Sequence, residues 1–329
     1  MSDIYDLAIL GGGPAGITAA IYASRARLNT IWIDKNFAPG GQVTATYAVD
    51  NYPGMPGISG MDLGEAFGAH ARKLRLEPQR EKILSLENIS GEIKTIRTKK
   101  HEYQAKALIL AFGAEHRKLD IPGEDDLSGL GVSYCATCDG AFYKDRTAVV
   151  VGGGNVAAED AVFLSGHFVL SQDLKGNTVP HHFYILTGKN FLLKCLICSK
   201  RITAMNKIYP FTEAGKKNCI LCCHVSSPHY HCGPIRNIKT NEERELTAEG
   251  VFIAVGIVPN TTLVKDQLKL DENGYICAGE EGVTSAPGVF AAGDIRTKAL
   301  RQIVTAVSDG ANAVASAQKY LWRKDNGND

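Results

Sequence analysis

The chain has 329 residues, a length that accommodates about two domains. Its residues are 44% hydrophobic, 22% charged and 8% aromatic, which is typical of a globular protein with a full core. The 36 basic and 35 acidic residues leave a net charge of +1, so no excess of positive charge points to nucleic acid or an anionic membrane.

Targeting to or through a membrane is not expected. The mean hydropathy is −0.10, and no apolar run approaches the ~20 residues that span a bilayer. Asp3 and Asp6 precede a short apolar run over 7–10, whereas a secretory signal needs a basic start and a longer apolar stretch. We therefore expect a cytoplasmic protein.

A nucleotide-binding turn is predicted near the N-terminus. An apolar strand over 4–10 runs into the pattern G-x-G-x-x-G, and small apolar residues at helical spacing follow. The three glycines are Gly11, Gly13 and Gly16. The first permits a tight turn, the second lets the backbone approach a pyrophosphate, and the third lets helix and strand pack closely. A second strand over 30–33 closes on Asp34, an acid suited to the ribose hydroxyls of an adenosine.

A pair of cysteines comes next, Cys135 and Cys138, with Asp139 directly after it. The pattern C-x-x-C in a cytosolic α/β protein is typical of a redox dithiol. Half a zinc site and two unrelated buried thiols are the other interpretations, and no second C-x-x-C lies nearby in the sequence. A carboxylate beside a thiol pair can give and accept a proton when the disulfide opens.

A second nucleotide-binding turn follows the cysteines. A strand over 147–151 leads into G-x-G-x-x-A, and a helix is expected over 157–164. The residues of this turn are Gly152, Gly154, Asn155 and Ala157. One such turn suits a dehydrogenase, whereas two suit a flavoprotein that takes a hydride from a nicotinamide and stores it on FAD.

The C-terminal region supplies a further polar residue at the end of a strand. An apolar strand over 288–292 ends at Gly293 and Asp294. Ligands of α/β proteins bind at the carboxyl ends of parallel strands, so Asp294 is a candidate binding residue; a simple helix cap is the other interpretation. A helix with small residues at three-to-four spacing is expected over 299–322.

Together these motifs resemble low-molecular-weight thioredoxin reductases, in the FAD/NADPH pyridine nucleotide-disulfide oxidoreductase family. The resemblance covers residues 1 to about 164 and about 235 to 322. Besides the two glycine turns, the motifs that carry it are Gly40-Gly41-Gln42, Asn51-Tyr52-Pro53-Gly54, Cys135 to Gly140, Gly250 to Gly256, Pro259-Asn260-Thr261, Ala291 to Asp294, and Arg301-Gln302.

The resemblance implies an α/β fold of two Rossmann-like dinucleotide-binding domains, the second inserted into the first. An FAD domain would comprise 1–116 and 247–329, and a pyridine-nucleotide and disulfide domain would comprise 117–246. The implied enzyme is a thioredoxin-disulfide reductase that passes electrons from NADPH through FAD and the Cys-Ala-Thr-Cys disulfide to thioredoxin. A homodimer is expected, without nucleic-acid or membrane partners. The inserted domain would rotate, because the disulfide and the nicotinamide need the same flavin face.

Residue roles follow from the same resemblance. Cys138 would face the flavin, Cys135 would attack thioredoxin, and Asp139 would shuttle the proton. For FAD, the first three glycines would hold the pyrophosphate, with Asp34 at the adenosine ribose and Asp294 at the ribityl chain. The other expected FAD residues are Gly40, Gly41, Gln42, Asn51, Ile295, Arg301, Gln302 and Ile303. NADPH would bind at Gly152, Gly154, Asn155 and Ala157, and no metal is expected.

The resemblance stops between 165 and 233. Here the family has a His-Arg-Arg run with a further arginine for the 2′-phosphate of NADPH, and this chain has none. Instead the segment holds six of the nine cysteines and six of the nine histidines. We therefore expect weak or absent NADPH binding.

Three interpretations of this segment are open. Cys195-x2-Cys198 and Cys219-x2-Cys222 approximate a four-thiolate zinc site, which would suit a non-catalytic metal-binding or redox-sensing homologue. A divergent domain could serve a dithiol reductase or oxidase with another electron donor, such as reduced ferredoxin. Thirdly, the segment could be translated out of frame. We favour the third, because periodicity and composition break together and recover by residue 235; ordered strands between 175 and 230 would count against it.

Overall fold

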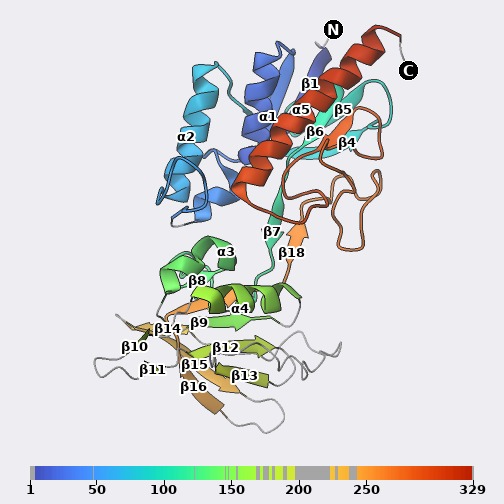
Figure 1. Ribbon diagram of the computed structural model, residues 1–329. Helices are drawn as coiled ribbons and strands as arrows, with labels where there is room; N and C mark the ends of the chain where they lie inside the picture. Colours follow the sequence, from blue (N-terminus) through green and yellow to red (C-terminus); the bar gives the residue numbers. More distant parts are fainter. Residues whose placement is uncertain are drawn as a thin grey trace. The chain divides into compact units, whose positions relative to one another are not determined.

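The computed structural model describes residues 4–46, 48–121, 123–144, 146, 148–152, 155–167, 171–172, 178–179, 182–187, 191–196, 223–226, 229–236 and 243–327. The chain divides into two compact units (Figure 1). The first combines Met1–Glu115 with Ile257–Asp329, and the second is His116–Gly256. Among the described residues, no helix is both long and apolar enough to cross a bilayer.

The first unit contains a seven-stranded sheet of order β3-β2-β1-β6-β5-β4, with β19 paired to β6. Its strands are β1 (Ile4–Leu10), β2 (Thr30–Asp34), β3 (Gln79–Arg80), β4 (Ile83–Glu87), β5 (Lys94–Thr98), β6 (Glu102–Leu110) and β19 (Val289–Ala291). β1, β2, β3, β6 and β19 pair in parallel, whereas β4, β5 and β6 pair antiparallel. The last strand of the unit thus enters a sheet begun by the first.

Successive side chains of β1 point to opposite faces of the sheet, and both faces are buried. Leu7 and Ile9 join one core cluster, while Ala8 and Leu10 join the other, as a period of two requires. The first cluster includes apolar residues of α1 (Pro14–Arg25) and α5 (Ile303–Asp325), which lie side by side in Figure 1. Small residues permit this approach: a Cβ on Gly310 would lie 2.2 Å from the Ala15 carbonyl oxygen.

The helices η1 (Gly41–Ala45) and α2 (Gly60–Lys73) follow β2 in this unit. Ser59 caps α2, because its Oγ accepts the Asp62 N–H at 3.1 Å. β7 (Ala114–His116) and β18 (Ile257–Pro259) form a two-stranded sheet where the chain passes from one unit to the other.

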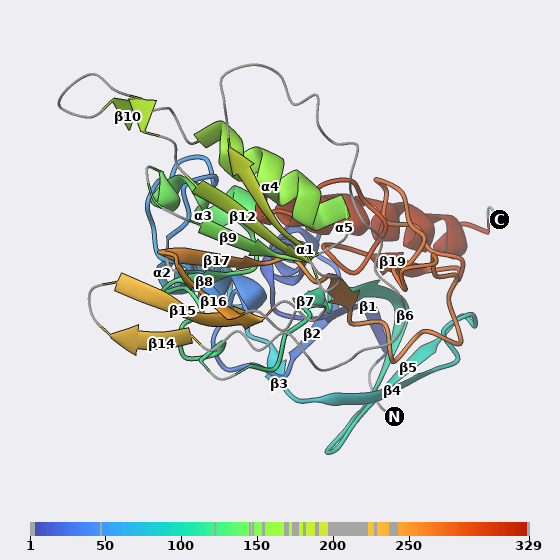
Figure 2. The same cartoon turned by 90° about the horizontal axis from the view of Figure 1, so that it is seen from below.

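The second unit contains a five-stranded sheet of order β13-β12-β9-β17-β8. Its strands are β8 (Val132–Ser133), β9 (Ala148–Val151), β12 (His182–Thr187), β13 (Phe191–Leu196) and β17 (Gly250–Ile253). All the pairs are parallel except β12 with β13. Figure 2 shows α4 (Asn155–His167) running along this sheet. The other elements are α3 (Ala136–Asp139), η2 (Gly140–Tyr143), β10 (Ser171–Gln172), β11 (Thr178–Val179), β14 (Cys223–Ser226), β15 (His229–Arg236) and β16 (Glu243–Thr247).

The predicted α/β class is confirmed, and so are the strands and helices around both glycine turns. The chain passes from one unit to the other between residues 115 and 116 and between residues 256 and 257. The second position differs from the predicted 246/247, because β17 pairs with β9 and β8 and so belongs to the second unit.

The segment 165–233 also differs from the favoured expectation. The structure has strands between 175 and 230, and β12 pairs in parallel with β9. These strands count against the out-of-frame interpretation. Cys198, Cys219 and Cys222 of the zinc interpretation lie outside the described residues, and no metal-binding cluster occurs within the described ranges.

Candidate cofactor site and redox disulfide

The first glycine turn joins β1 to α1 in a conformation that side chains would block. Gly11 has φ +125°, and a Cβ there would lie 2.2 Å from the Ala111 carbonyl oxygen. A Cβ on Gly16 would lie 2.0 Å from the Gly11 carbonyl oxygen. At Gly13, by contrast, a Cβ would meet nothing within 4 Å. The turn is therefore closely packed at Gly11 and Gly16 and open at Gly13. There the N-terminus of α1 presents free N–H groups.

Asp34 lies against this turn at the end of β2. Its carboxylate is so close that a Cβ on Gly12 would fall 2.2 Å from Oδ2. Burial raises the pKa of Asp34, and Arg80, with Nη1 3.8 Å from Oδ2, opposes that rise. The side chain is 7% exposed, so this carboxylate is a buried hydrogen-bond acceptor beside the phosphate-binding geometry.

Residues after β2 contact the first glycine turn or lie near it. The Gly40 N–H donates to the Gly12 carbonyl at 3.0 Å, and a Cβ on Gly41 would lie 3.0 Å from the Gly13 Cα. Gln42 is the second residue of η1, directly after Gly41. Asn51 Nδ2 donates to Gln302 Oε1 at 2.9 Å, although 251 positions separate the two residues. Two predicted FAD residues from opposite ends of the chain are thus brought together.

The segment after β19 carries two buried polar atoms without a hydrogen bond from the described residues, although Lys298 Nζ lies 4.0 Å from one of them, Asp294 Oδ1. Asp294 Oδ1 and Arg301 Nε are buried and have no hydrogen-bond partner among the described residues. The Arg301 guanidinium lies 3.9 Å from the Tyr275 ring centroid. Burial raises the pKa of Asp294, while the charges of Lys298 and Arg301 oppose the rise. Buried polar atoms without partners are rare, so they indicate a polar ligand here.

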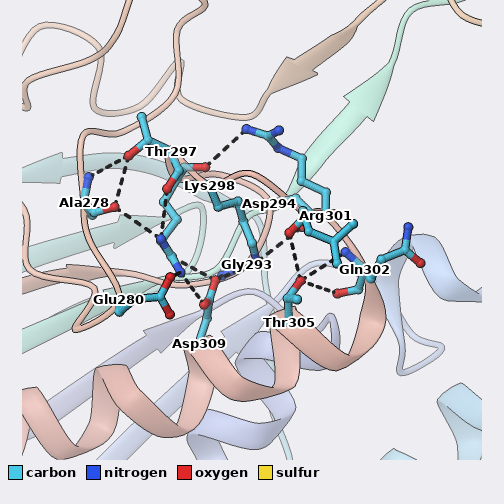
Figure 3. A network of polar contacts seen from close by, with 12 residues as sticks. Ala278, Glu280, Gly293, Asp294, Thr297, Lys298, Arg301, Gln302, Thr305 and Asp309 are labelled. Carbon is cyan, nitrogen blue, oxygen red and sulfur yellow. Dashed lines mark hydrogen bonds and ion pairs between the residues drawn. The ribbon is translucent and has the colours of Figure 1, made fainter. Parts of the chain in front are cut away.

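A buried ion-pair network supports this segment from beneath (Figure 3). Asp309 of α5 accepts hydrogen bonds from Arg296 Nη2 at 2.6 Å, Arg296 Nε at 2.9 Å and Lys298 Nζ at 2.9 Å. It also accepts the Gly293 N–H at 2.9 Å, which fixes the turn just before Asp294. Burial acts to raise the pKa of Asp309, but the hydrogen bonds from Arg296 and Lys298 outweigh it, and the pKa is lowered. No motif in the sequence singles out these three charged residues.

These observations fit FAD. The open glycine turn suits a pyrophosphate, and the Asp34 carboxylate suits ribose hydroxyls. Asp294 Oδ1 and Arg301 Nε, which have no hydrogen bond within the described part of the chain, offer an acceptor and a donor to the rest of such a ligand. Ile295 is fully buried in the core of the sheet, so only its backbone could serve a ligand. Ile303 packs with Val43 and its neighbours beside η1.

The cysteine pair lies in the second unit. Cys135 and Cys138 form a disulfide, with Cα atoms 5.2 Å apart. Cys135 occupies the N-cap of α3, and its carbonyl accepts the N–H groups of Cys138 at 3.2 Å and Asp139 at 3.1 Å. Burial raises the pKa of Asp139, so this carboxyl holds its proton more readily than an exposed aspartate does.

The second glycine turn follows β9 in the same unit. A Cβ on Gly152 would lie 2.3 Å from the Ala254 carbonyl oxygen and 2.8 Å from the Ala157 Cβ, so strand and helix pack closely here. Ala157 is 1% exposed, and Asn155 begins α4. Gly154 lies outside the described residues.

Known proteins share this arrangement. A family model described as pyridine nucleotide-disulphide oxidoreductase matches residues 5–187 and 229–310. The chain belongs to this family. A thioredoxin reductase of Listeria innocua is 41% identical over 323 residues, covering 97% of this chain and 94% of the relative. These findings confirm the resemblance to low-molecular-weight thioredoxin reductases.

Solved structures of family members agree with the fold. A thioredoxin reductase from Streptococcus pyogenes is 36% identical with a TM-score of 0.80, covering 98% of this chain and 99% of that one. A ferredoxin-flavin thioredoxin reductase from Clostridium acetobutylicum is 27% identical with a TM-score of 0.51, covering 98% and 99%. The name of the second enzyme includes ferredoxin, whereas the name of the first gives no electron donor.

Proposed function

We propose that this chain is a thioredoxin-disulfide reductase that passes electrons from NADPH through FAD to the Cys135–Cys138 disulfide and on to thioredoxin. The observation that carries this function is the disulfide of Cys135 and Cys138, set in one unit with a dinucleotide turn at Gly152. The full-length similarity to a thioredoxin reductase supports it.

The first unit would hold FAD, which supplies hydride acceptance and two-electron transfer when bound. The backbone at Gly11, Gly13 and Gly16 would approach the pyrophosphate, and Asp34 would accept hydrogen bonds from ribose hydroxyls. Asp294 Oδ1 and Arg301 Nε would gain the hydrogen bonds that the described residues do not give them. The other residues expected at FAD would line or support the same site; they are Gly40, Gly41, Gln42, Asn51, Ile295, Gln302 and Ile303.

The disulfide and its neighbouring carboxyl would perform the thiol chemistry. Two electrons break the S–S bond, Cys138 being the sulfur that receives them from the flavin side and Cys135 the one that attacks the thioredoxin disulfide. Only a thiolate attacks efficiently, so one sulfur must stay deprotonated while Asp139 protonates the other. Burial suits Asp139 to this task, because it keeps the proton available nearer neutral pH.

A coupled assay tests the function. With NADPH and oxidised thioredoxin, the FAD-loaded protein should reduce the thioredoxin disulfide under anaerobic conditions. Cys138→Ser should abolish this reduction while FAD stays bound. Cys277→Ser is the matched control, because Cys277 is a free cysteine in the other unit and should retain full turnover. Equal activity of Cys138→Ser and the unmutated chain would contradict the proposal.

A second candidate function differs in its electron donor. The chain lacks the basic run expected at the 2′-phosphate of NADPH, and a ferredoxin-flavin thioredoxin reductase shares its fold. Anaerobic titration separates the two. Rapid bleaching of the flavin absorbance at micromolar NADPH supports the first function, whereas bleaching only by reduced ferredoxin supports the second.

Assembly and location complete the proposal. The homodimer is expected from the family resemblance and the cytoplasmic location from the sequence, with no nucleic-acid or membrane partner. Light scattering on the FAD-loaded protein should give twice the chain mass of 35.4 kDa. A monomer at micromolar concentration would contradict the dimer.

A further inference from the structure

Ser133 lies at the junction between β8 and the disulfide, where its hydroxyl contacts both Cys135 and Asp139. The side chain is almost fully buried, at 4% exposure. Its Oγ accepts the Cys135 N–H at 3.1 Å. The same Oγ lies 2.6 Å from Asp139 Oδ2 and 3.4 Å from the Cys135 carbonyl oxygen. The hydroxyl therefore links the backbone of one cysteine to the carboxyl of Asp139.

The proton of this hydroxyl has a preferred acceptor. A serine hydroxyl donates one hydrogen bond and accepts up to two. Because the Cys135 N–H is already a donor to Oγ, the hydroxyl proton must point to Asp139 Oδ2 or to the Cys135 carbonyl. The 2.6 Å separation is in the range of a strong charge-assisted O–H···O bond, and 3.4 Å is beyond a good one. Ser133 thus donates to Oδ2.

An oxygen that accepts the Ser133 proton at such a distance does not carry the acid proton itself. When Asp139 is neutral, its proton must therefore be on Oδ1. Oδ1 is the buried oxygen that has no hydrogen-bond partner within the described part of the chain. Oδ1 can therefore donate its proton to a group that forms when the disulfide opens.

We propose that Ser133 is a positioning residue that holds the acid proton of Asp139 on Oδ1, from which it passes to a thiolate when the disulfide opens. The inference rests on the proposed function of Asp139. Two electrons break the S–S bond and leave two thiolates. The Oδ1 proton converts one of them to a thiol, and Asp139 remains as a carboxylate stabilised by the Ser133 hydrogen bond. Water then restores the proton.

Among the described residues, Ser133 is the polar side chain with the main effect on the pKa of Asp139. The disulfide of Cys135 and Cys138 does not titrate. Helix α4 packs against α3 and carries the acids Glu159 and Asp160. Within the described ranges, burial raises the pKa of Asp139, the Ser133 hydrogen bond lowers it, and no charged group contributes.

A pH profile distinguishes positioning from a packing role. Ser133→Ala removes a hydrogen bond to the charged form of Asp139, so the pKa of Asp139 should rise by about one unit. Turnover of thioredoxin should fall at high pH as Asp139 loses its proton. The pH at which it falls to half, measured with whichever donor bleaches the flavin, should rise by about one unit. Turnover should fall about tenfold. Ser133→Thr keeps the hydroxyl and should restore both values, and Asp160→Asn should leave the profile unchanged.

The direction of the shift is decisive. If Asp139 instead donated its proton from Oδ2 to Ser133, the alanine variant would lose a bond to the neutral form and the pH limb would move down. A downward shift, or none, overturns the inference. If Ser133→Ala does not fold and bind FAD, Ser133→Cys provides the same comparison with a weaker donor.

A double-mutant cycle separates this inference from the proposed function. Asp139→Asn should lower turnover strongly, and adding Ser133→Ala to it should cause no further loss. If the second change still costs tenfold, Ser133 acts elsewhere and only the inference fails. If Asp139→Asn alone matches the unmutated protein, the proposed role of Asp139 fails as well.

Discussion

Replacing Asp309 by alanine should cost more stability than any exposed charge change. The side chain is 3% exposed and holds the cations of Arg296 and Lys298, which are 3% and 5% exposed. Alanine removes the acceptor that both cations share with the Gly293 N–H. Arg296 would keep only carbonyl acceptors and the exposed Glu280, and Lys298 only the longer contact with Asp294. Removing one partner of a buried ion pair costs about 3–5 kcal/mol. For a unit of this size, we expect a fall in Tm of about 10 °C.

Thermal unfolding at pH 7 measures this change, followed by circular dichroism on flavin-free and FAD-loaded protein. The flavin-free measurement separates the loss of the ion pair from weaker FAD binding. Glu65→Ala is the control, because its ion pair with Arg72 is exposed and should be worth less than about 1 kcal/mol. A Tm for Asp309→Ala within about 2 °C of the Glu65→Ala value would refute the reasoning.

Acidification should shrink the effect of this replacement. The pKa of Asp309 is lowered in the folded state, so the unfolded chain binds a proton first as the pH falls. The stabilisation is therefore fully present above the ordinary value of 3.8 and is lost as the pH falls through the folded-state pKa. The difference between the two proteins should be constant near neutrality and smaller below pH 3.8.

Three further predictions follow from the site and its surroundings. Asp34→Ala should weaken FAD binding about tenfold or more in a fluorescence titration, through lost hydrogen bonds of a charged group; unchanged affinity would remove Asp34 from the site. Asn51→Ala should weaken FAD binding less, because it loses one exposed bond to Gln302; an effect above that of Asp34→Ala would reverse this ranking. Asp160→Asn should stabilise the protein at pH 7 by about 1 kcal/mol after allowance for solvent screening, because burial raises the pKa of Asp160 to about 6. Denaturant unfolding at pH 4 should show no such gain.

Local patterns were sufficient to predict the elements that surround each glycine turn. The apolar run before Gly11 and the small residues after Gly16 specify a strand and a helix through neighbours only. The acid at Asp34 followed from its spacing along the same segment. Such features need no knowledge of distant parts of the chain.

Distant pairing could not be predicted in the same way. The hydrogen bond between Asn51 and Gln302 depends on β19 pairing with β6, which brings the C-terminal segment to the first sheet. A sequence pattern alone does not reveal which strand pairs with which. Resemblance to a family suggested that both residues bind FAD, but only the fold brings them into contact.

A signal for Asp309 was present and was not used. Asp309 lies three positions after Ala306 and four before Ala313, on the face of α5 that packs in the core. A charged residue on such a face requires a buried partner of opposite charge, and Arg296 and Lys298 follow Asp294 closely. Ser133 gave no comparable signal, because a serine before a cysteine pair has many structural roles.

The pairing of β19 with β6, a strand made much earlier, has a consequence for biosynthesis. Val289 to Ala291 pair with Leu108 to Leu110, and α5 then covers α1. A ribosome must therefore translate the whole second unit, and nearly all of the first, before the proposed FAD site is complete. Nascent chains still attached at residue 280 should take up no FAD, so flavin loading in cells should begin only as synthesis ends.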